Sequence, residues 1–134
     1  MILHLDFSDE VLYAELNGTY FPAEGWHDLV AADLEVWLPR LISFAMGHSD
    51  ACTLPFMDGP ACIKLYRQSD GGIRADCLWD QRIQSSRIID LRELLRSAVS
   101  CLRRCNRLRY EAGECALFAP ELAQISVLLK QLPQ

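Results

Sequence analysis

Three histidines and six cysteines are the side chains of this 134-residue sequence best suited to binding a metal ion or attacking a substrate. His4, His27 and His48 are scattered, and no two cysteines form a CxxC pair. Cys101 and Cys105 stand four residues apart, a spacing that on a helix offers two thiolates to one ion. A structural zinc site usually needs four such ligands. We therefore predict no metal site and interpret the cysteines as reduced, mostly buried thiols.

Short motifs that accompany common catalytic and cofactor sites are absent from the sequence. It contains no GxSxG, HExxH, P-loop or GxGxxG segment. Carboxylates are numerous, but Asp33 and Glu35 stand two residues apart and would diverge on a helix. The sequence therefore predicts no catalytic residue and no cofactor. A small enzyme, as an alternative, would require a deep pocket that holds His27 or His48 beside a cysteine or a carboxylate.

Charge is distributed unevenly along the chain. Residues 1–60 hold ten acidic residues and one basic residue, a net charge of −9, whereas residues 61–134 hold twelve basic and eight acidic residues, a net charge of +4. Eight arginines lie between positions 82 and 109. Such asymmetry indicates either a surface for a charged partner or two halves that complement each other within one fold.

The arginine-rich segment raises the question of nucleic acid, because a basic helix face can contact phosphates. The whole chain is acidic, however, with a net charge of −5 and a pI near 5.1. No aromatic residue is interleaved with these arginines except Tyr110 at their end. We therefore predict no nucleic-acid binding.

Hydrophobic periodicity indicates which elements position these residues. Alternating apolar and polar residues predict strands, at 2–7, 11–16, 19–21, 51–57, 61–68, 73–79 and 82–89. Helical periodicity predicts three helices, which follow Asp28, Asp90 and Ala119. Since tight turns join neighbouring strands, we predict an α+β fold with a mainly antiparallel sheet of five to six strands. Three helices pack on one face of this sheet, giving a two-layer single domain over residues 1–134.

Local signals add detail to three of these elements. Asp28 is predicted to cap the first helix, and Pro39 to kink it or split it after Leu38. Asp90 and Glu93 have the spacing of a capping box. The hairpin around residues 69–72 is predicted to adopt the register that gives one apolar face, made of Ile63, Leu65, Ile73, Ala75, Cys77 and Trp79.

The N-terminal residues carry no secretory signal, since MILHLDFSDE has no basic region and soon becomes acidic. No apolar run approaches the roughly 18–20 residues that a membrane span needs. The sequence therefore predicts a cytoplasmic protein without a membrane segment.

The layout of the chain resembles that of small bacterial immunity proteins from polymorphic-toxin and contact-dependent growth inhibition systems. The resemblance is carried by short segments, NGTYFP at 17–22, WHD at 26–28, WL at 37–38, DGP at 58–60 and the leucine- and arginine-rich helix from Asp90. It implies a non-catalytic cytoplasmic protein that binds one cognate toxin domain and blocks it. It provides no catalytic residues.

The acidic N-terminal half is the predicted contact surface for such a toxin, because charge complementarity speeds association and selects partners. The predicted partner-binding residues are Asp6, Asp9, Glu10, Glu15, Glu24, Trp26 and Asp28. The alternative is a self-associating structural or regulatory module. In that case the acidic half of one copy meets the arginine helix of a second copy in a homodimer.

Overall fold

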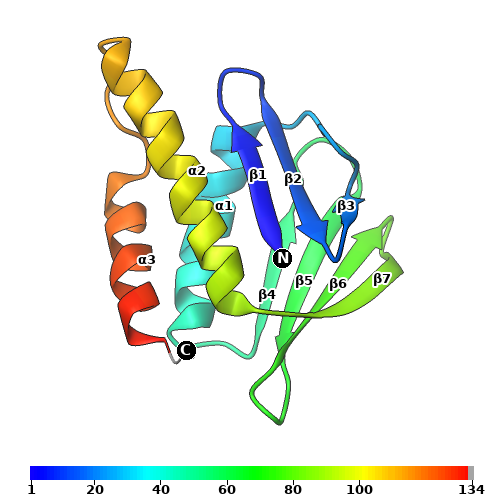
Figure 1. The fold of residues 1–134 in the computed structure, drawn as a ribbon. Coiled ribbons are helices and arrows are strands. Elements are labelled where there is room, and N and C mark those ends of the chain that lie inside the picture. The colour runs from blue at the N-terminus through cyan, green and yellow to red at the C-terminus, as the bar shows by residue number, and fades with distance from the viewer. Residues whose placement is uncertain (133–134) are drawn as a thin grey trace.

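The strands of this protein divide into two antiparallel sheets, one before and one after the first helix (Figure 1). The computed structural model describes residues 1–132. The first sheet has the order β1-β2-β3 and the second the order β4-β5-β6-β7. The strands are β1 (Ile2–Asp6), β2 (Val11–Leu16), β3 (Thr19–Phe21), β4 (Ala51–Pro55), β5 (Ala61–Arg67), β6 (Ile73–Trp79) and β7 (Arg82–Ile89). The helices are α1 (Val30–Ala45), α2 (Leu91–Glu111) and α3 (Ala119–Gln131).

The predicted α+β class is confirmed, but the predicted single sheet of five to six strands is wrong. Within residues 1–132, seven strands form two sheets, and the helices do not cover one face of a common sheet. Helix α2 packs along β1, α1 packs along β4, and α3 contacts both of these helices. The reason lies at the outer edges of β1 and β4, where a further strand would have to pair.

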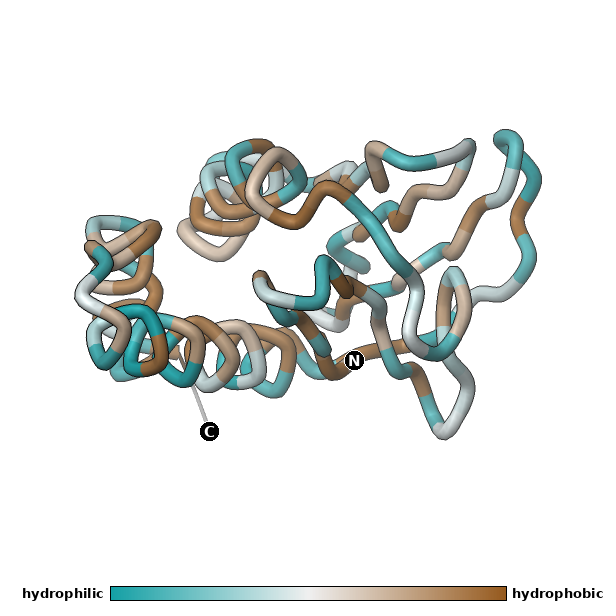
Figure 2. Tube along the Cα trace, turned by 90° about the horizontal axis from the view of Figure 1, so that it is seen from above, coloured by the Kyte–Doolittle hydropathy of each residue, from teal (hydrophilic) through white to brown (hydrophobic). Residues whose placement is uncertain are grey.

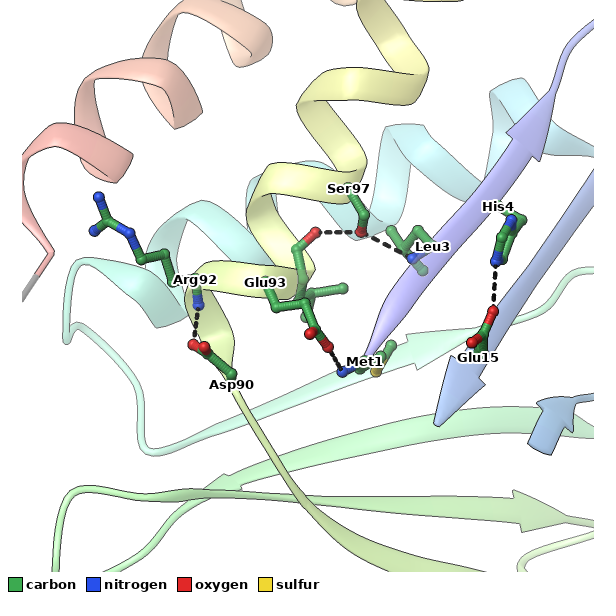
Figure 3. Close-up of polar contacts among 9 residues, drawn as sticks. Met1, Leu3, His4, Glu15, Asp90, Arg92, Glu93 and Ser97 are labelled. Carbon is green, nitrogen blue, oxygen red and sulfur yellow. Dashed lines mark hydrogen bonds and ion pairs between the residues drawn. The ribbon is translucent and has the colours of Figure 1, made fainter. Parts of the chain in front are cut away.

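Side chains of α2 occupy the outer edge of β1. The backbone N–H of Leu3 donates to Oγ of Ser97 at 2.8 Å (Figure 3), and its carbonyl accepts from Sγ of Cys101 at 3.4 Å. The carbonyl of Leu5 accepts from the guanidinium of Arg104 at 3.1 Å. Because these backbone groups already have partners, β1 ends its sheet without an exposed pairing edge.

Side chains of α1 likewise occupy the outer edge of β4. Nε1 of Trp37 donates to the carbonyl of Pro55 at 2.5 Å, and Arg40 donates to the carbonyl of Thr53 at 2.7 Å. Two helices thus terminate two sheets by side-chain hydrogen bonds, and this prevents β1 and β4 from joining into the single sheet that strand counting predicted.

One hydrophobic cluster fills the space between the two sheets and the three helices. Alternate residues of β1, β2, β4 and β5 point into it. Figure 2 shows hydrophobic positions along the inner sides of the helices and strands. Its largest fully buried side chains include Trp37, Phe44, Leu12, Leu54 and Leu94, which come from both sheets and from two helices.

Helix termini differ in part from the sequence expectations. The helix α1 is continuous through Pro39, so of the two predicted outcomes, a kink or a split after Leu38, the split is wrong. Its N-cap residue is Leu29, which makes no side-chain cap, so the assignment of Asp28 as the cap is also wrong. Helix α2 begins as predicted, because the side chain of Asp90 accepts from the backbone N–H of Arg92 at 2.9 Å (Figure 3).

The second half of the predicted capping box at α2 has a different partner. Glu93 accepts a hydrogen bond from the N-terminal ammonium of Met1 at 2.6 Å and so ties the start of β1 to the first turn of α2 (Figure 3).

The β5–β6 hairpin confirms the predicted register. Ile63 lies opposite Cys77, and Leu65 lies opposite Ala75, and all four side chains are buried. Trp79 ends the same face but is 39% exposed.

Candidate partner-binding surface

The sheet β1-β2-β3 has one buried face and one outer face. Leu3 and Leu5 of β1 and Leu12 of β2 point into the core, so the residues between them point outward. The outward residues are Ile2, His4, Asp6, Val11, Tyr13 and Glu15, and all of them are partly exposed.

Aromatic rings form a contiguous group on this outer face. The ring of His4 stacks on Tyr13 with centroids 4.8 Å apart, and Tyr13 meets Tyr20 of β3 edge-on at 5.8 Å. Tyr20 remains 41% exposed. Tyrosine offers a large apolar ring with a polar tip, which suits it to contacts between proteins.

Carboxylates surround these rings. Glu15 lies 3.1 Å from Nε2 of His4 across the β1–β2 pair (Figure 3). Glu24 follows β3 and is exposed, and its charge acts with partial burial to raise the pKa of Tyr13. Asp6 ends β1 on the same side of the sheet. We call this surface the acidic face and define it by the carboxylates of Asp6, Glu15 and Glu24 and the rings of His4, Tyr13 and Tyr20.

Two further predicted residues, Asp9 and Glu10, lie in the exposed turn between β1 and β2. The turn is closed by Asp6, whose Oδ1 accepts from the backbone N–H of Asp9 at 3.2 Å. Glu10 reaches the start of α1, where Oε2 accepts from the N–H of Val30 at 3.2 Å. A carboxylate at a helix N-terminus is favourable, so Glu10 supplies the stabilisation expected of Asp28.

The last two predicted residues, Trp26 and Asp28, fold inward. Asp28 is only 4% exposed, and its Oδ2 accepts from Nε1 of Trp26 at 2.8 Å. Its Oδ1 accepts from the backbone N–H groups of Leu29, Met57 and Asp58 at 2.8–3.2 Å. The Asp28 carboxylate therefore joins the β3–α1 connection to the β4–β5 loop and is not available to a partner.

A second buried carboxyl group, Asp33 of α1, completes this cluster. It is fully buried and accepts from the N–H of Met57 at 2.9 Å through Oδ1, while Oδ2 has no donor. Burial, together with the hydrogen bond to Asp28, raises the pKa of Asp33 to about 8. Burial also opposes ionisation of Asp28, but hydrogen bonds from Asp33, Trp26 and the backbone outweigh it and lower the pKa of Asp28. At neutral pH the pair carries one shared proton and one negative charge.

The structure thus brings Asp6, Glu15 and Glu24 together on one face, places Asp9 and Glu10 in the adjoining turn, and separates Trp26 and Asp28 from them. The sequence prediction missed His4 and Tyr13, although the strand alternation already placed both on the outer side. It also missed Asp33, for which no signal exists, because only the β4–β5 loop creates its environment.

Other kinds of site receive little support from the described part of the chain. Residues 1–132 contain no group of three His, Cys, Asp or Glu side chains arranged to hold a metal ion. His27 and His48 are exposed, and the ring of His27 contacts the backbone carbonyl of Asp9 at 3.1 Å. No helix within residues 1–132 combines the length and the apolar character needed to cross a membrane.

No protein-family model, curated protein or solved structure matches this chain. Function must therefore be inferred from the surface itself.

Proposed function

We propose that this protein is a non-catalytic immunity protein that binds and neutralises a cognate bacterial toxin domain through its acidic face. The observation that carries the proposal is that Asp6, Glu15 and Glu24 form no ion pair with an arginine or lysine of residues 1–132. Glu15 lies directly opposite Tyr20 across β2 and β3, and the ring of Tyr20 is exposed, so charge and an aromatic anchor coincide.

The chemistry of such a surface fits a basic partner. Uncompensated carboxylates steer a positively charged domain into the encounter and specify its orientation. A central aromatic ring contributes most to affinity once it is desolvated, because aromatic residues dominate interface energetics. Many toxin domains that act on nucleic acid would present a basic surface of this kind, and covering that surface would block their access to substrate.

The test uses the product of the gene adjacent to that of this protein. Its C-terminal domain is expressed alone and together with this protein, and growth is measured. The proposal expects growth arrest by the domain alone, rescue by this protein, and a complex of the purified pair by titration calorimetry. A neighbouring product that does not arrest growth, or one that does not bind this protein, overturns the immunity function.

Two matched variants locate the surface. The first combines Glu15→Lys and Glu24→Lys on the acidic face. The control combines Glu35→Lys on α1 and Asp50→Lys before β4, which are also exposed and change the net charge equally. Rescue and binding are expected to be lost in the first variant and kept in the control. Equal behaviour of the two variants would show that the acidic face is not the contact.

A further inference from the structure

A groove lined by arginines runs between α2 and α3. It is formed by Arg96, Val99, Ser100, Arg103, Arg104, Arg107 and Leu129. Two of the arginines contact neutral groups of the chain, since Arg103 donates to Oγ of Ser126 at 3.3 Å and Arg104 to the carbonyl of Leu5 at 3.1 Å. None of the four forms an ion pair with a carboxylate of residues 1–132. We call this surface the arginine groove.

The absence of such ion pairs bears on the charge asymmetry of the sequence. If the acidic half and the arginine helix compensated each other within one copy of the fold, ion pairs would join them. In residues 1–132 no ion pair joins an acidic residue of 1–60 to an arginine of α2. Both charged surfaces therefore face solvent without their natural counterpart.

The two surfaces are also neighbours that point in the same direction. Helix α2 lies beside β1 (Figure 1) and buries Leu94, Ala98 and Leu102 against the core. Arg96 and Arg107 follow the opposite side of the helix, since residues there are rotated by about half a turn from the buried stripe. In β1 the buried residues likewise face the core and the acidic face is opposite. The arginine groove and the acidic face thus form one continuous outer surface with a positive half and a negative half.

A surface divided in this way is complementary to itself after a two-fold rotation. With the axis near the boundary at Leu5 and Arg104, the negative half of one copy covers the positive half of the other, and the reverse contact occurs at the same time. The dimensions are similar, because Arg96 to Arg107 extends over ~17 Å of helix and Ile2 to Asp6 over ~14 Å of strand.

We propose that this protein forms a two-fold symmetric homodimer in which the acidic face of each copy docks on the arginine groove of the other. The occupant of the groove is a second copy because its negative surface has the matching charge and length. The dimer does not depend on the proposed immunity function. It does use the same acidic face, so a toxin and a second copy would compete for it.

Sedimentation velocity of the full chain tests the dimer without any partner. Because exposed ion pairs are screened by salt, the dimer present at about 50 mM NaCl is expected to dissociate at about 500 mM. The groove-reversed variant, Arg103→Glu with Arg107→Glu, and the face-reversed variant, Glu15→Lys with Glu24→Lys, are each expected to be monomeric. Circular dichroism melts establish that both variants are folded.

Mixing the two variants provides the decisive measurement. In the mixed pair one contact retains the natural charges and the other has both charges exchanged, so both contacts are attractive. A 1:1 mixture is therefore expected to restore the dimer. The matched control is a variant with Arg82→Glu and Arg87→Glu on β7, which is expected to dimerise without a second variant.

Three results would overturn the proposal. The first is a monomer at low salt. The second is a mixture of the two variants that stays monomeric although both are folded. The third is a dimer that resists salt but is lost on Ile88→Lys. Ile88 is 66% exposed on β7, so this result would place the interface at the edge of that strand.

Discussion

Two groups of carboxylates in the N-terminal half of this protein share a charge but not an environment. Asp28 and Asp33 are buried and accept hydrogen bonds from two segments of the chain, the β3–α1 connection and the β4–β5 loop. Glu15 and Glu24 lie on the acidic face, where they remain accessible to solvent. The comparison shows that acidic residues clustered in sequence divide into a group that stabilises the fold and a group that is available for recognition.

Within the buried group the two carboxyl groups also differ from each other. Asp28 accepts every one of its hydrogen bonds, from Trp26, from backbone N–H groups and from Asp33. Asp33 supplies the proton to that last bond, so it acts as a donor as well as an acceptor. The same chemical group therefore has opposite roles at two positions five residues apart, and a single type of substitution distinguishes them.

The largest effect is expected for Asp28→Asn. The new amide would direct an NH₂ group at Nε1 of Trp26 or at the backbone N–H groups of Met57 and Asp58, which are all donors. A buried donor left without an acceptor costs about 1–3 kcal/mol, and more than one is affected here, so we expect a loss of roughly 2–4 kcal/mol in the free energy of unfolding. Urea denaturation at pH 7 measures this loss. A loss smaller than that caused by the same change at an exposed acidic residue would contradict this role of Asp28.

A smaller effect, and one that depends on pH, is expected for Asp33→Asn. The amide replaces the shared proton with an N–H donor to Asp28, so the variant should lie within about 1 kcal/mol of the wild type at acidic pH, where Asp33 is protonated in both the folded and the unfolded chain, and should become more stable than the wild type as the pH rises. Above the ordinary pKa near 3.8, the unfolded chain releases a proton that Asp33 in the folded chain keeps until pH about 8. Stability contributed by Asp33 is therefore complete at acidic pH and is lost as the pH rises toward about 8, by at most ~1.4 kcal/mol for each pH unit.

Denaturation of the wild type and of Asp33→Asn between pH 5 and pH 9 checks this dependence. The slope attributable to Asp33 should disappear in the variant, because the amide does not titrate. An identical slope in both proteins would mean that Asp33 is ionised in the folded state at neutral pH.

The effect of a single lost hydrogen bond is expected for Trp26→Phe. This change removes the N–H donor to Asp28 but keeps most of the ring that packs edge-on against Trp79 at 5.9 Å. Since Asp28 retains its backbone donors, we expect a loss of about 1.5 kcal/mol, the lower end of the range for one hydrogen bond to a charged group. Thermal unfolding of the variant beside Trp79→Phe, which removes no hydrogen bond to Asp28, separates the bond from the packing.

Much of this architecture follows from local sequence patterns. Alternation in residues 2–7 and 11–16 predicted both strands and the side on which Asp6 and Glu15 lie. The glycines of the β5–β6 hairpin and its apolar face predicted the register of Leu65 opposite Ala75. These features depend on residues close in sequence, so the period of the pattern is enough to predict them.

Features that depend on distant residues could not be predicted in this way. The division into two sheets depends on Ser97, Cys101 and Arg104 reaching the edge of β1, more than ninety residues away in sequence. The burial of Asp28 depends in turn on the β4–β5 loop, whose backbone N–H groups satisfy the carboxylate. The local sequence does not distinguish Asp28 from the other acidic residues before the first helix, which is why it was grouped with the exposed residues.

The smallest effect on stability is expected on the acidic face, for Glu15→Gln combined with Glu24→Gln. Neither side chain is buried, and within residues 1–132 the only ion pair lost is that of Glu15 with His4, which is weak because both side chains are partly exposed to solvent. The free energy of unfolding should change by less than about 0.5 kcal/mol, the usual range for exposed positions. Removing two like charges from a surface crowded with acids also relieves repulsion, which offsets the loss of the pair with His4.

The same double variant should have a large effect on association, because recognition by the acidic face depends on charge that the fold does not need. Dimer formation at low salt, measured by sedimentation, should weaken while the urea midpoint stays constant. If the midpoint instead falls by an amount comparable to that for Asp28→Asn, these carboxylates belong with the buried pair, and the distinction between a stabilising and a recognising group of acids fails. Unchanged stability with weakened association would separate the two groups by function as clearly as burial separates them in the structure.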